Sequence, residues 1–222
     1  MPSYKLTYFP ARGRAEVARQ LFYLSGVPFE DVRITMAEWP EFKPKTPFGQ
    51  IPLLEVDGQP IPQSFAIFRY LAKEFGMIQL PLHSLSYWRI GFVGDNAFES
   101  AWVDAIADQH KDYMNEIRPA LVVYMGFAQG DKEQLVKDVA TPARDKYFGI
   151  LEKIAKENGN NGHFVGSALT WIDLLIADHA SVLTKHIPGF LDGFPAVLDT
   201  VRKIESTPKL KEWIEKRPET AF

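Results

Sequence analysis

The most informative segment of the sequence reads Gly49-Gln50-Ile51-Pro52-Leu53-Leu54-Glu55-Val56-Asp57-Gly58 and, two residues later, Ile61-Pro62-Gln63-Ser64-Phe65-Ala66-Ile67-Phe68-Arg69-Tyr70-Leu71. Pro52 has no N–H for a sheet ladder, which predicts the start of a strand and makes the Ile51-Pro52 bond a candidate for the cis form. Asp57-Gly58 is typical of a hairpin turn. It predicts a strand at Leu53–Val56 paired with a shorter one at Gln59–Ile61.

A helix is expected directly after this hairpin, from Ser64 to Phe75, with Gly76 as its stop. Ser64 is a candidate N-cap, so backbone N–H groups and the positive end of the helix dipole converge beside Gln63 and Ser64. Such a helix start binds carboxylates. An extended backbone edge followed by an anion site fits a peptide-like ligand with a free α-carboxylate.

The remaining sequence predicts two domains, an N-terminal thioredoxin-like α/β domain and a C-terminal all-α helical bundle. Before the hairpin we expect a strand at Tyr4–Phe9, a helix at Arg14–Leu24, a strand at Phe29–Ile34 and a loop at Trp39–Gly49. From about Asn96 strands disappear, and helices are expected at Phe98–Tyr113, Pro119–Gly126, Lys132–Asn158, Thr170–His186 and Ala196–Glu205. The predicted boundaries are 1–76, a linker at 77–95 and 96–222.

Composition narrows the function. The chain has 222 residues, a net charge of −3 and no cysteine. The dispersed basic residues disfavour nucleic acid as a partner, and no apolar run is long enough to span a membrane. The sequence lacks a signal-peptide pattern, which predicts a cytoplasmic protein. Any thiol chemistry must use a ligand's sulfur, and the five histidines lack metal-ligand spacing, so no metal site is expected.

The 49–71 segment resembles the glutathione site of the cytosolic glutathione transferases. The resemblance extends from Tyr4 to the tail, and its sigma-class features are Tyr4-Lys5-Leu6-Thr7-Tyr8-Phe9, Ala11-Arg12-Gly13-Arg14-Ala15-Glu16, Trp39 and Lys43. It implies glutathione as cosubstrate, no cofactor, and a homodimer. The implied reaction is conjugation of glutathione to hydrophobic electrophiles. It also implies an electrophile pocket built from Phe9, Pro10, the fourth helix and the C-terminal tail.

Tyr8 and Arg14 are the candidate catalytic residues. Spacing alone leaves Tyr8 open as a buried core tyrosine and Arg14 as a solvated surface arginine. The resemblance implies that the Tyr8 hydroxyl donates to the glutathione sulfur and that Arg14 organises the region near the thiolate. A free thiol has a pKa of about 8.5, so only about 3% is thiolate at pH 7. A hydrogen bond to the anion favours the charged form.

The resemblance implies glutathione contacts at Tyr8 and at seven further residues of the N-terminal domain, namely Trp39, Lys43, Gly49, Gln50, Ile51, Gln63 and Ser64. Trp39 and Lys43 would hold the glycine end, and Lys43 is a suitable point charge for its carboxylate. Gln50 and the backbone of Ile51 would bind the cysteinyl part as an added strand does. Gln63 and Ser64 would hold the γ-glutamyl carboxylate.

An acidic row on the fourth helix, Asp104, Asp108 and Asp112, has helical spacing. It reads equally as a solvated stripe or, because like charges repel mildly at this spacing, as a row with a partner. The resemblance makes Asp112 the residue that reaches the ligand's amino group across a dimer interface. Related enzymes place a divalent metal near this position, but Lys111 precedes Asp112 here and disfavours one.

Two further segments have other interpretations. Thr170-Trp171-Ile172-Asp173 is a capping box that predicts a helix start with a structural role. Met77–Gly91 is a largely apolar insertion that the resemblance does not cover. It is open to three readings: an adventitious segment, a wall over the electrophile pocket, or an altered dimer contact.

Three functional alternatives to conjugation remain open within this resemblance. One is a glutathione-dependent prostaglandin isomerase. Another is a non-catalytic carrier of haem or other apolar ligands, and the third is a structural protein of the lens-crystallin type. Intact Tyr8, Arg14, Gln63 and Ser64 argue against a loss of function.

Overall fold

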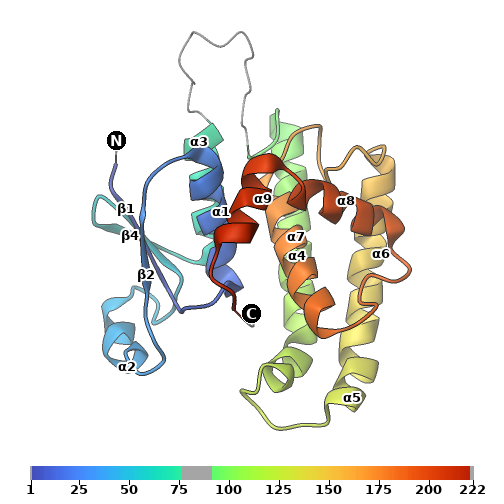
Figure 1. Ribbon diagram of the computed structural model, residues 1–222, viewed down its shortest axis with the longest axis horizontal. Helices are drawn as coiled ribbons and strands as arrows, with labels where there is room; N and C mark the ends of the chain where they lie inside the picture. Colours follow the sequence, from blue (N-terminus) through green and yellow to red (C-terminus); the bar gives the residue numbers. More distant parts are fainter. Residues whose placement is uncertain (1, 77–91, 221–222) are drawn as a thin grey trace.

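A four-stranded sheet forms the first lobe of the computed structural model, which describes residues 2–76 and 92–220 (Figure 1). The strands are β1 (Tyr4–Tyr8), β2 (Glu30–Arg33), β3 (Leu53–Val56) and β4 (Gln59–Pro62), in the order β2-β1-β3-β4. β1 and β2 are parallel, whereas the pairs β1/β3 and β3/β4 are antiparallel. This mixed sheet confirms the thioredoxin-like prediction.

The hairpin between β3 and β4 forms as its turn residues predict. Asp57 and Gly58 have φ values of 48° and 79°, the positive values that a tight two-residue hairpin turn requires. Leu54 pairs with Ile61 in the resulting register. The Ile51-Pro52 peptide bond is cis, as expected for a proline at this strand start.

The helices of this lobe are α1 (Glu16–Ser25), α2 (Trp39–Phe42) and α3 (Ser64–Gly76), with 3₁₀ turns at Gly13–Ala15 and Lys43–Lys45. α1 and α3 lie between the sheet and the second lobe (Figure 1). The prediction of a plain loop at Trp39–Gly49 was wrong. Pro40 and Pro44 do not break structure there, because each occupies a first-turn position where its missing N–H costs nothing.

The start of α3 differs from the prediction by one residue. Gln63 takes a left-handed φ of 74°, and its carbonyl accepts a 3.0 Å bond from the N–H of Ile67. Gln63 therefore occupies the N-cap place and Ser64 is the first helical residue. The correction leaves the first-turn N–H groups of α3 beside both side chains.

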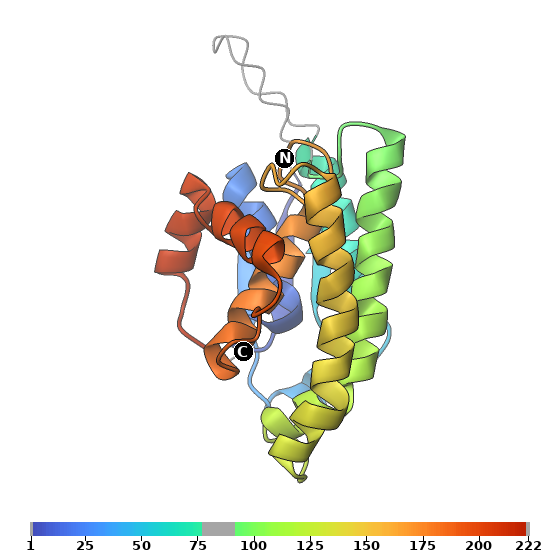
Figure 2. The same ribbon diagram turned by 90° about the vertical axis from the view of Figure 1, so that its right-hand side faces the viewer.

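Helices form the whole second lobe within its described residues. They are α4 (Ala97–Tyr124), α5 (Lys132–Leu135), a π-helical turn (Val136–Ala140), α6 (Thr141–Glu157), α7 (Trp171–His186), α8 (Pro195–Glu205) and α9 (Pro208–Lys216). α4 and α6 run side by side along the lobe (Figure 2). The sequence reading divided α4 in two at Pro119 and did not predict α9. Pro119 is exposed, so water can satisfy the carbonyl that it leaves unbonded.

The capping box at α7 is confirmed. The fully buried Asp173 carboxylate accepts the N–H of Thr170 at 2.7 Å and that of Phe164 at 2.8 Å. Trp171 then packs its ring 5.8 Å from Phe65 and 5.9 Å from Phe68, centroid to centroid. This box therefore fixes the point where α7 meets α3 and joins the two lobes.

Within residues 2–76 and 92–220, no helix is long and apolar enough to cross a membrane. The predicted insertion Met77–Gly91 lies outside the described residues. α3 ends at Gly76 and α4 begins at Ala97, on either side of the predicted linker.

Candidate active site

Tyr8 ends β1, and the following loop folds back over its ring. The backbone N–H of Arg14 donates to the Tyr8 hydroxyl oxygen at 3.2 Å. Gly13 makes this close approach possible, because it has a φ of 41° and a Cβ at that position would lie 2.8 Å from the same oxygen. The loop therefore aims a backbone donor at the half-buried tyrosine hydroxyl.

The Tyr8 hydroxyl has one role left to fill. Its oxygen accepts from Arg14, and within the described residues its proton has no acceptor. The accepting bond lies at the start of the helical segment that leads into α1, where the dipole favours negative charge. An anionic atom beside Tyr8 would therefore accept a hydrogen bond from the hydroxyl and would be stabilised by the positive end of the helix dipole. The Arg14 side chain is exposed.

The ring of Phe9 lies between those of Tyr8 and Trp39 and contacts both. The Phe9 ring lies 5.6 Å from that of Tyr8 and 5.8 Å from that of Trp39, in an edge-on arrangement with the latter. Edge-to-face pairs of this kind are favourable beyond their buried area. The half-buried Trp39 thus belongs to the same surface as the candidate catalytic tyrosine.

Lys43 and Gly49 meet in the loop that precedes the cis proline. Gly49 has a φ of 63°, and the Lys43 side chain passes 3.4 Å from where a Cβ would stand. Thr46, which the sequence reading missed, fixes this loop. Its hydroxyl donates to the Lys43 carbonyl at 2.9 Å and accepts the N–H of Gln50 at 3.1 Å. A threonine directly before Pro47 in a proline-rich segment was the signal available in the sequence, and the structure shows that this threonine is buried.

Gln50 and Gln63 are brought together from opposite ends of the hairpin. The Gln63 side-chain amide donates to the Gln50 side-chain oxygen at 3.0 Å, and both residues are exposed. Ser64 follows at the first turn of α3. Two amides, a hydroxyl and free helix N–H groups thus cluster at one place, a set that can bind a carboxylate.

Asp112 does not join this group in the single chain. It is exposed on α4, and within the described residues no contact links it to the residues above. The other two members of the acidic row have a partner on α3, since Arg69 lies 2.7 Å from Asp104 and 3.6 Å from Asp108. No group of three or more potential metal ligands occurs among residues 2–76 and 92–220.

Comparison with known proteins identifies the family. The glutathione S-transferase N-terminal domain matches residues 4–73, and the glutathione S-transferase C-terminal domain matches residues 112–217. Glutathione S-transferase 1 of Ascaris suum is 45% identical over 222 residues, covering all of both chains. The chain belongs to the glutathione S-transferase family.

Solved structures of transferases agree with this assignment. A transferase from Necator americanus, described as monomeric, is 49% identical with a TM-score of 0.90, covering 99% of this chain and 100% of that one. A Nu-class transferase from Haemonchus contortus is 50% identical with a TM-score of 0.85, covering all of both chains. Prostaglandin synthase D of Nilaparvata lugens is more distant, at 32% identity and a TM-score of 0.81 over 98% of this chain and all of that one. The sigma-class assignment stays a prediction.

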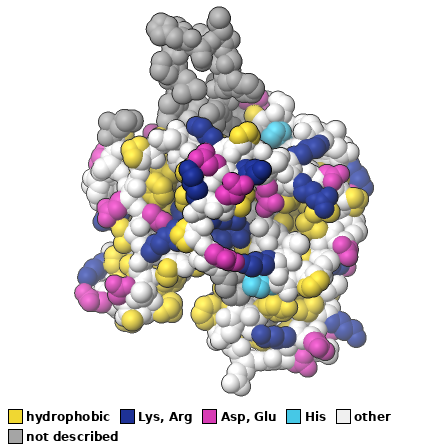
Figure 3. Space-filling model, viewed as in Figure 1, with side chains coloured by type: hydrophobic (Ala, Val, Ile, Leu, Met, Phe, Trp, Pro, Cys, Tyr) yellow, Lys and Arg dark blue, Asp and Glu magenta, His cyan; other side chains and the backbone are white. Residues whose placement is uncertain are grey.

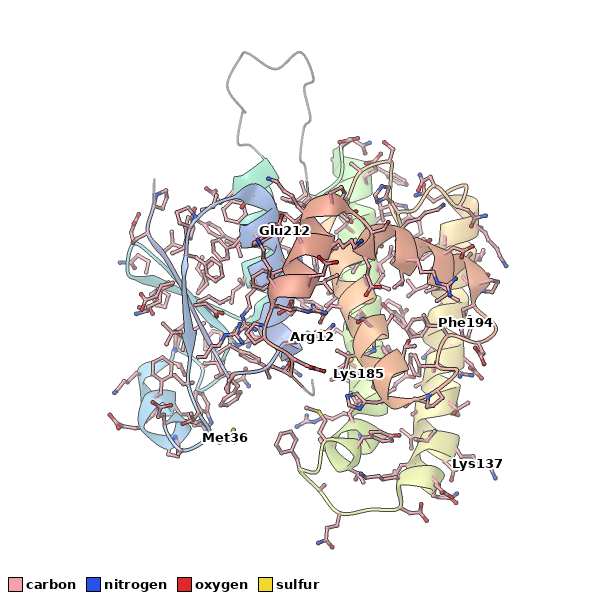
Figure 4. All side chains as sticks on the ribbon, viewed as in Figure 1. Arg12, Met36, Lys137, Lys185, Phe194 and Glu212 are labelled. Atoms are coloured by element: carbon pink, nitrogen blue, oxygen red, sulfur yellow. The ribbon has the colours of Figure 1, made fainter. Side chains whose placement is uncertain are left out.

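Between the lobes of this transferase lies a hollow rimmed by hydrophobic side chains (Figure 3). Met36 lies on the rim formed by the N-terminal lobe (Figure 4) and is 62% exposed. Phe127, in the segment between α4 and α5, is 70% exposed. An apolar molecule that binds in the hollow could cover the exposed Met36 side chain and remove it from water.

Sequence reasoning missed a buried ionic cluster of the transferase that connects the loop after Tyr8 to α7. Arg12, in that loop, donates from Nε to the Asp178 carboxylate at 3.0 Å, across 166 residues of sequence. Arg217, beyond α9, approaches the same carboxylate at 3.3 Å and that of Glu16 at 2.9 Å. Burial raises the pKa of Asp178 to about 6 although both guanidinium groups oppose this. No local pattern marks such long-range pairs.

Proposed function

We propose that the protein transfers the glutathione thiolate to hydrophobic electrophiles and that Tyr8 stabilises this thiolate. The observation that carries the proposal is the bond from the Arg14 N–H to the Tyr8 hydroxyl oxygen. Because that oxygen already accepts a bond, its own proton is polarised and turned outward as a donor. The cysteinyl thiolate of glutathione beside it would accept a hydrogen bond from this hydroxyl. The nucleophile would then be the cosubstrate's sulfur.

The energies are of the right size. Lowering a thiol pKa of about 8.5 by about two requires ~2.7 kcal/mol of preference for the anion. A hydrogen bond to a charged group contributes about 1.5–3 kcal/mol. A helix start adds about 0.3–1 kcal/mol. One tyrosine hydroxyl at the start of α1 therefore suffices.

The remaining groups orient the tripeptide. Gln63 and Ser64, at the start of α3, suit the γ-glutamyl carboxylate, and Lys43 suits the glycine carboxylate at the other end. The backbone of Ile51 offers an extended edge for the cysteinyl part between them. This orientation places the sulfur toward Tyr8.

The apolar hollow between the lobes suits the electrophile. Phe9 follows Tyr8 directly, and Met36 exposes apolar surface at the rim. A hydrophobic acceptor would bury these side chains at a gain of about 25 cal/mol per Å² of apolar surface. The sulfur and its electrophile would then meet at the Tyr8 hydroxyl.

Replacement of Tyr8 by phenylalanine tests the proposal. We expect Tyr8→Phe to cut kcat by about 30- to 1000-fold, which corresponds to the loss of one donor to an anion. Glutathione affinity should change little, and the ultraviolet thiolate absorbance of the complex should move to higher pH. Tyr23→Phe, at a tyrosine whose hydroxyl meets Lys216 instead, is the matched control. Wild-type turnover and thiolate absorbance in Tyr8→Phe would contradict the role.

The same preparation separates this enzyme from a carrier or a structural protein. Retention on immobilised glutathione with turnover supports transfer. Retention without turnover would indicate a carrier of haem or other apolar ligands, or a structural protein. Prostaglandin isomerisation is a second candidate, which the likeness to a prostaglandin synthase favours. Incubation with a prostaglandin endoperoxide and glutathione, followed by product analysis, tests it.

We further propose that the active form is a homodimer in which Asp112 binds the partner's glutathione. Asp112 is exposed, and the groove of about 190 Å³ between α4 and α6 is lined by apolar residues that include the exposed Trp102 and Ile150. A second copy would cover this groove and give Asp112 the ligand's ammonium as a partner.

A further inference from the structure

The loop between Tyr8 and Arg14 is fastened by buried charged groups at two consecutive residues. The carbonyl of Ala11 accepts a 2.7 Å bond from the guanidinium of Arg19, whose side chain is fully buried. The next residue, Arg12, points away from the sheet into the space between the lobes (Figure 4). The loop that aims the Arg14 N–H at Tyr8 is therefore held from both lobes.

Arg12 holds on to α7 through several bonds at once. Its Nε donates to the Asp178 carboxylate at 3.0 Å, and its Nη2 donates to the Asp178 backbone carbonyl at 3.2 Å and to the same carboxylate. Both side chains are only about a tenth exposed. A guanidinium fork bound to a carboxylate and a carbonyl has little freedom of orientation, unlike a lysine in the same place.

Stability alone is a weak reason for such a pair. Burying two charges costs several kcal/mol, and replacing a buried ion pair by apolar residues of similar volume is often neutral or stabilising. What the pair supplies is geometry. The bond from Arg14 to Tyr8 is 3.2 Å long, at the outer end of the range for such bonds, so a small loop movement would break it.

We propose that Arg12 and Asp178 are positioning residues, which hold the Arg14 N–H on the Tyr8 hydroxyl and thereby set the acidity of the bound glutathione thiol. This inference rests on the proposed role of Tyr8. It assigns to α7 of the C-terminal lobe a part in activating a thiol that is bound by the N-terminal lobe.

The test replaces both partners, since removing one alone would leave a buried charge unpaired. In the double variant Arg12→Met/Asp178→Leu, Arg217 keeps Glu16 as its partner. We expect the pKa of bound glutathione, followed by thiolate absorbance, to rise by about 0.5–1, so that kcat at neutral pH falls about three- to tenfold. KM for glutathione should stay unchanged. Arg12→Lys, which keeps the charge but loses the fork, should give a smaller rise and serves if the double variant does not fold.

Thr170→Ala is the matched control, because it weakens the start of the same helix without touching the loop. It should lower the melting temperature and leave the thiol's pKa at its wild-type value. An equal rise in this control would show that any damage to α7 suffices, and the positioning role would be overturned.

A cycle with Tyr8→Phe separates the two proposals. If Arg12 and Asp178 act through Tyr8, the double variant should raise the thiol's pKa in the wild type and add nothing in the Tyr8→Phe background. An unchanged pKa in the double variant, or an equal rise in both backgrounds, overturns the positioning role while Tyr8 keeps its own. If Tyr8→Phe itself leaves the thiol's pKa unchanged, both proposals fail.

Discussion

Tyr8 and His110 are both titratable residues, and their surroundings are built in opposite ways. The Tyr8 oxygen is met by a backbone N–H at 3.2 Å, and within the described residues its proton stays free. His110 is buried, with Nδ1 3.0 Å from the Tyr147 hydroxyl. His179 lies 3.2 Å from the Tyr113 hydroxyl through Nε2, and the two tyrosine rings stack at 4.4 Å.

The two regions show that a group with a shifted pKa need not be a group that is available to bind a ligand. Burial lowers the pKa of His110 well below its ordinary range and that of His179 to about 4, and it raises the pKa of Tyr113. Each of these groups already has a hydrogen-bond partner inside the cluster. The groups around Tyr8 leave bonding capacity open toward solvent. In this protein a free donor marks the candidate site better than a displaced pKa does.

Acid should destabilise the protein through the histidine cluster around His110 and His179, and this is the largest effect on stability that we expect. The pKa of His179 falls from 6.5 to about 4 on folding, so between these values the unfolded chain binds more protons. Stability should therefore fall as pH drops through this window, by up to about 3 kcal/mol for this histidine. Urea unfolding at several pH values measures it. His179→Gln should remove part of the slope.

Asp178 works in the opposite sense over much of the same window, because its pKa is raised to about 6 and its folded carboxyl takes up a proton first. The difference between wild type and His179→Gln cancels this contribution, provided that Asp178 is unchanged. An unaltered slope in His179→Gln would mean that the imidazole is not held neutral by the fold.

Asp112 would make the C-terminal lobe part of the glutathione site, although the groups around Tyr8 all belong to the N-terminal lobe. We expect Asp112→Asn to weaken glutathione binding about tenfold, or ~1.4 kcal/mol, because it leaves the ligand's ammonium unpaired. The loss should be larger at low salt, where charges are less screened. Calorimetric titration at two salt concentrations measures both.

Purified hybrids of Asp112→Asn with Gln63→Ala subunits locate the contact. In a cross-subunit site the hybrid dimer has one intact and one doubly damaged site, so high-affinity binding returns at half occupancy. Two equally weakened sites would place Asp112 on its own subunit's ligand. A monomer in sedimentation, the state described for the Necator americanus transferase, would remove the homodimer altogether.

How far the sequence predicts the fold depends on how local the signal is. The turn at Asp57-Gly58 and the stop at Gly26, whose φ is 71°, follow from residues that tolerate positive φ. Predictions from local sequence patterns were wrong where solvent exposure or backbone conformation determines the outcome. Pro119 reads as a helix break, yet it lies on the exposed side of α4, where the lost bond is tolerated. Gln63 reads as the residue before a cap, yet its backbone takes the cap position.

In the candidate site too, the sequence predicts residues that belong to local motifs and misses those that meet only through long-range packing. Tyr8 and Gln63 belong to short continuous motifs, so the sequence is enough to predict them as site residues. Arg12 and Asp178 meet only because α1 and α7 pack together, and a separation of 166 residues carries no periodic or spacing signal. The sequence left Asp104 and Asp108 open as a solvated stripe or as a row with a partner, and the structure supplies a partner, Arg69, in the other lobe.

The smallest effect we expect is on stability, and it tests whether the capping box is purely structural or takes part in glutathione binding. Thr170 is buried, and its side chain lies within the cap at the start of α7. Thr170→Ala should lower the free energy of unfolding by about 1 kcal/mol, the usual cost of a lost cap. Glutathione affinity of the folded fraction should stay at the wild-type value, because the cap touches none of the groups around Tyr8. Thr170→Ser, which keeps the hydroxyl, should recover most of the stability. A large rise in KM without a drop in melting temperature would instead place this buried cap in the binding machinery, and burial would no longer separate structural from functional polar groups in this protein.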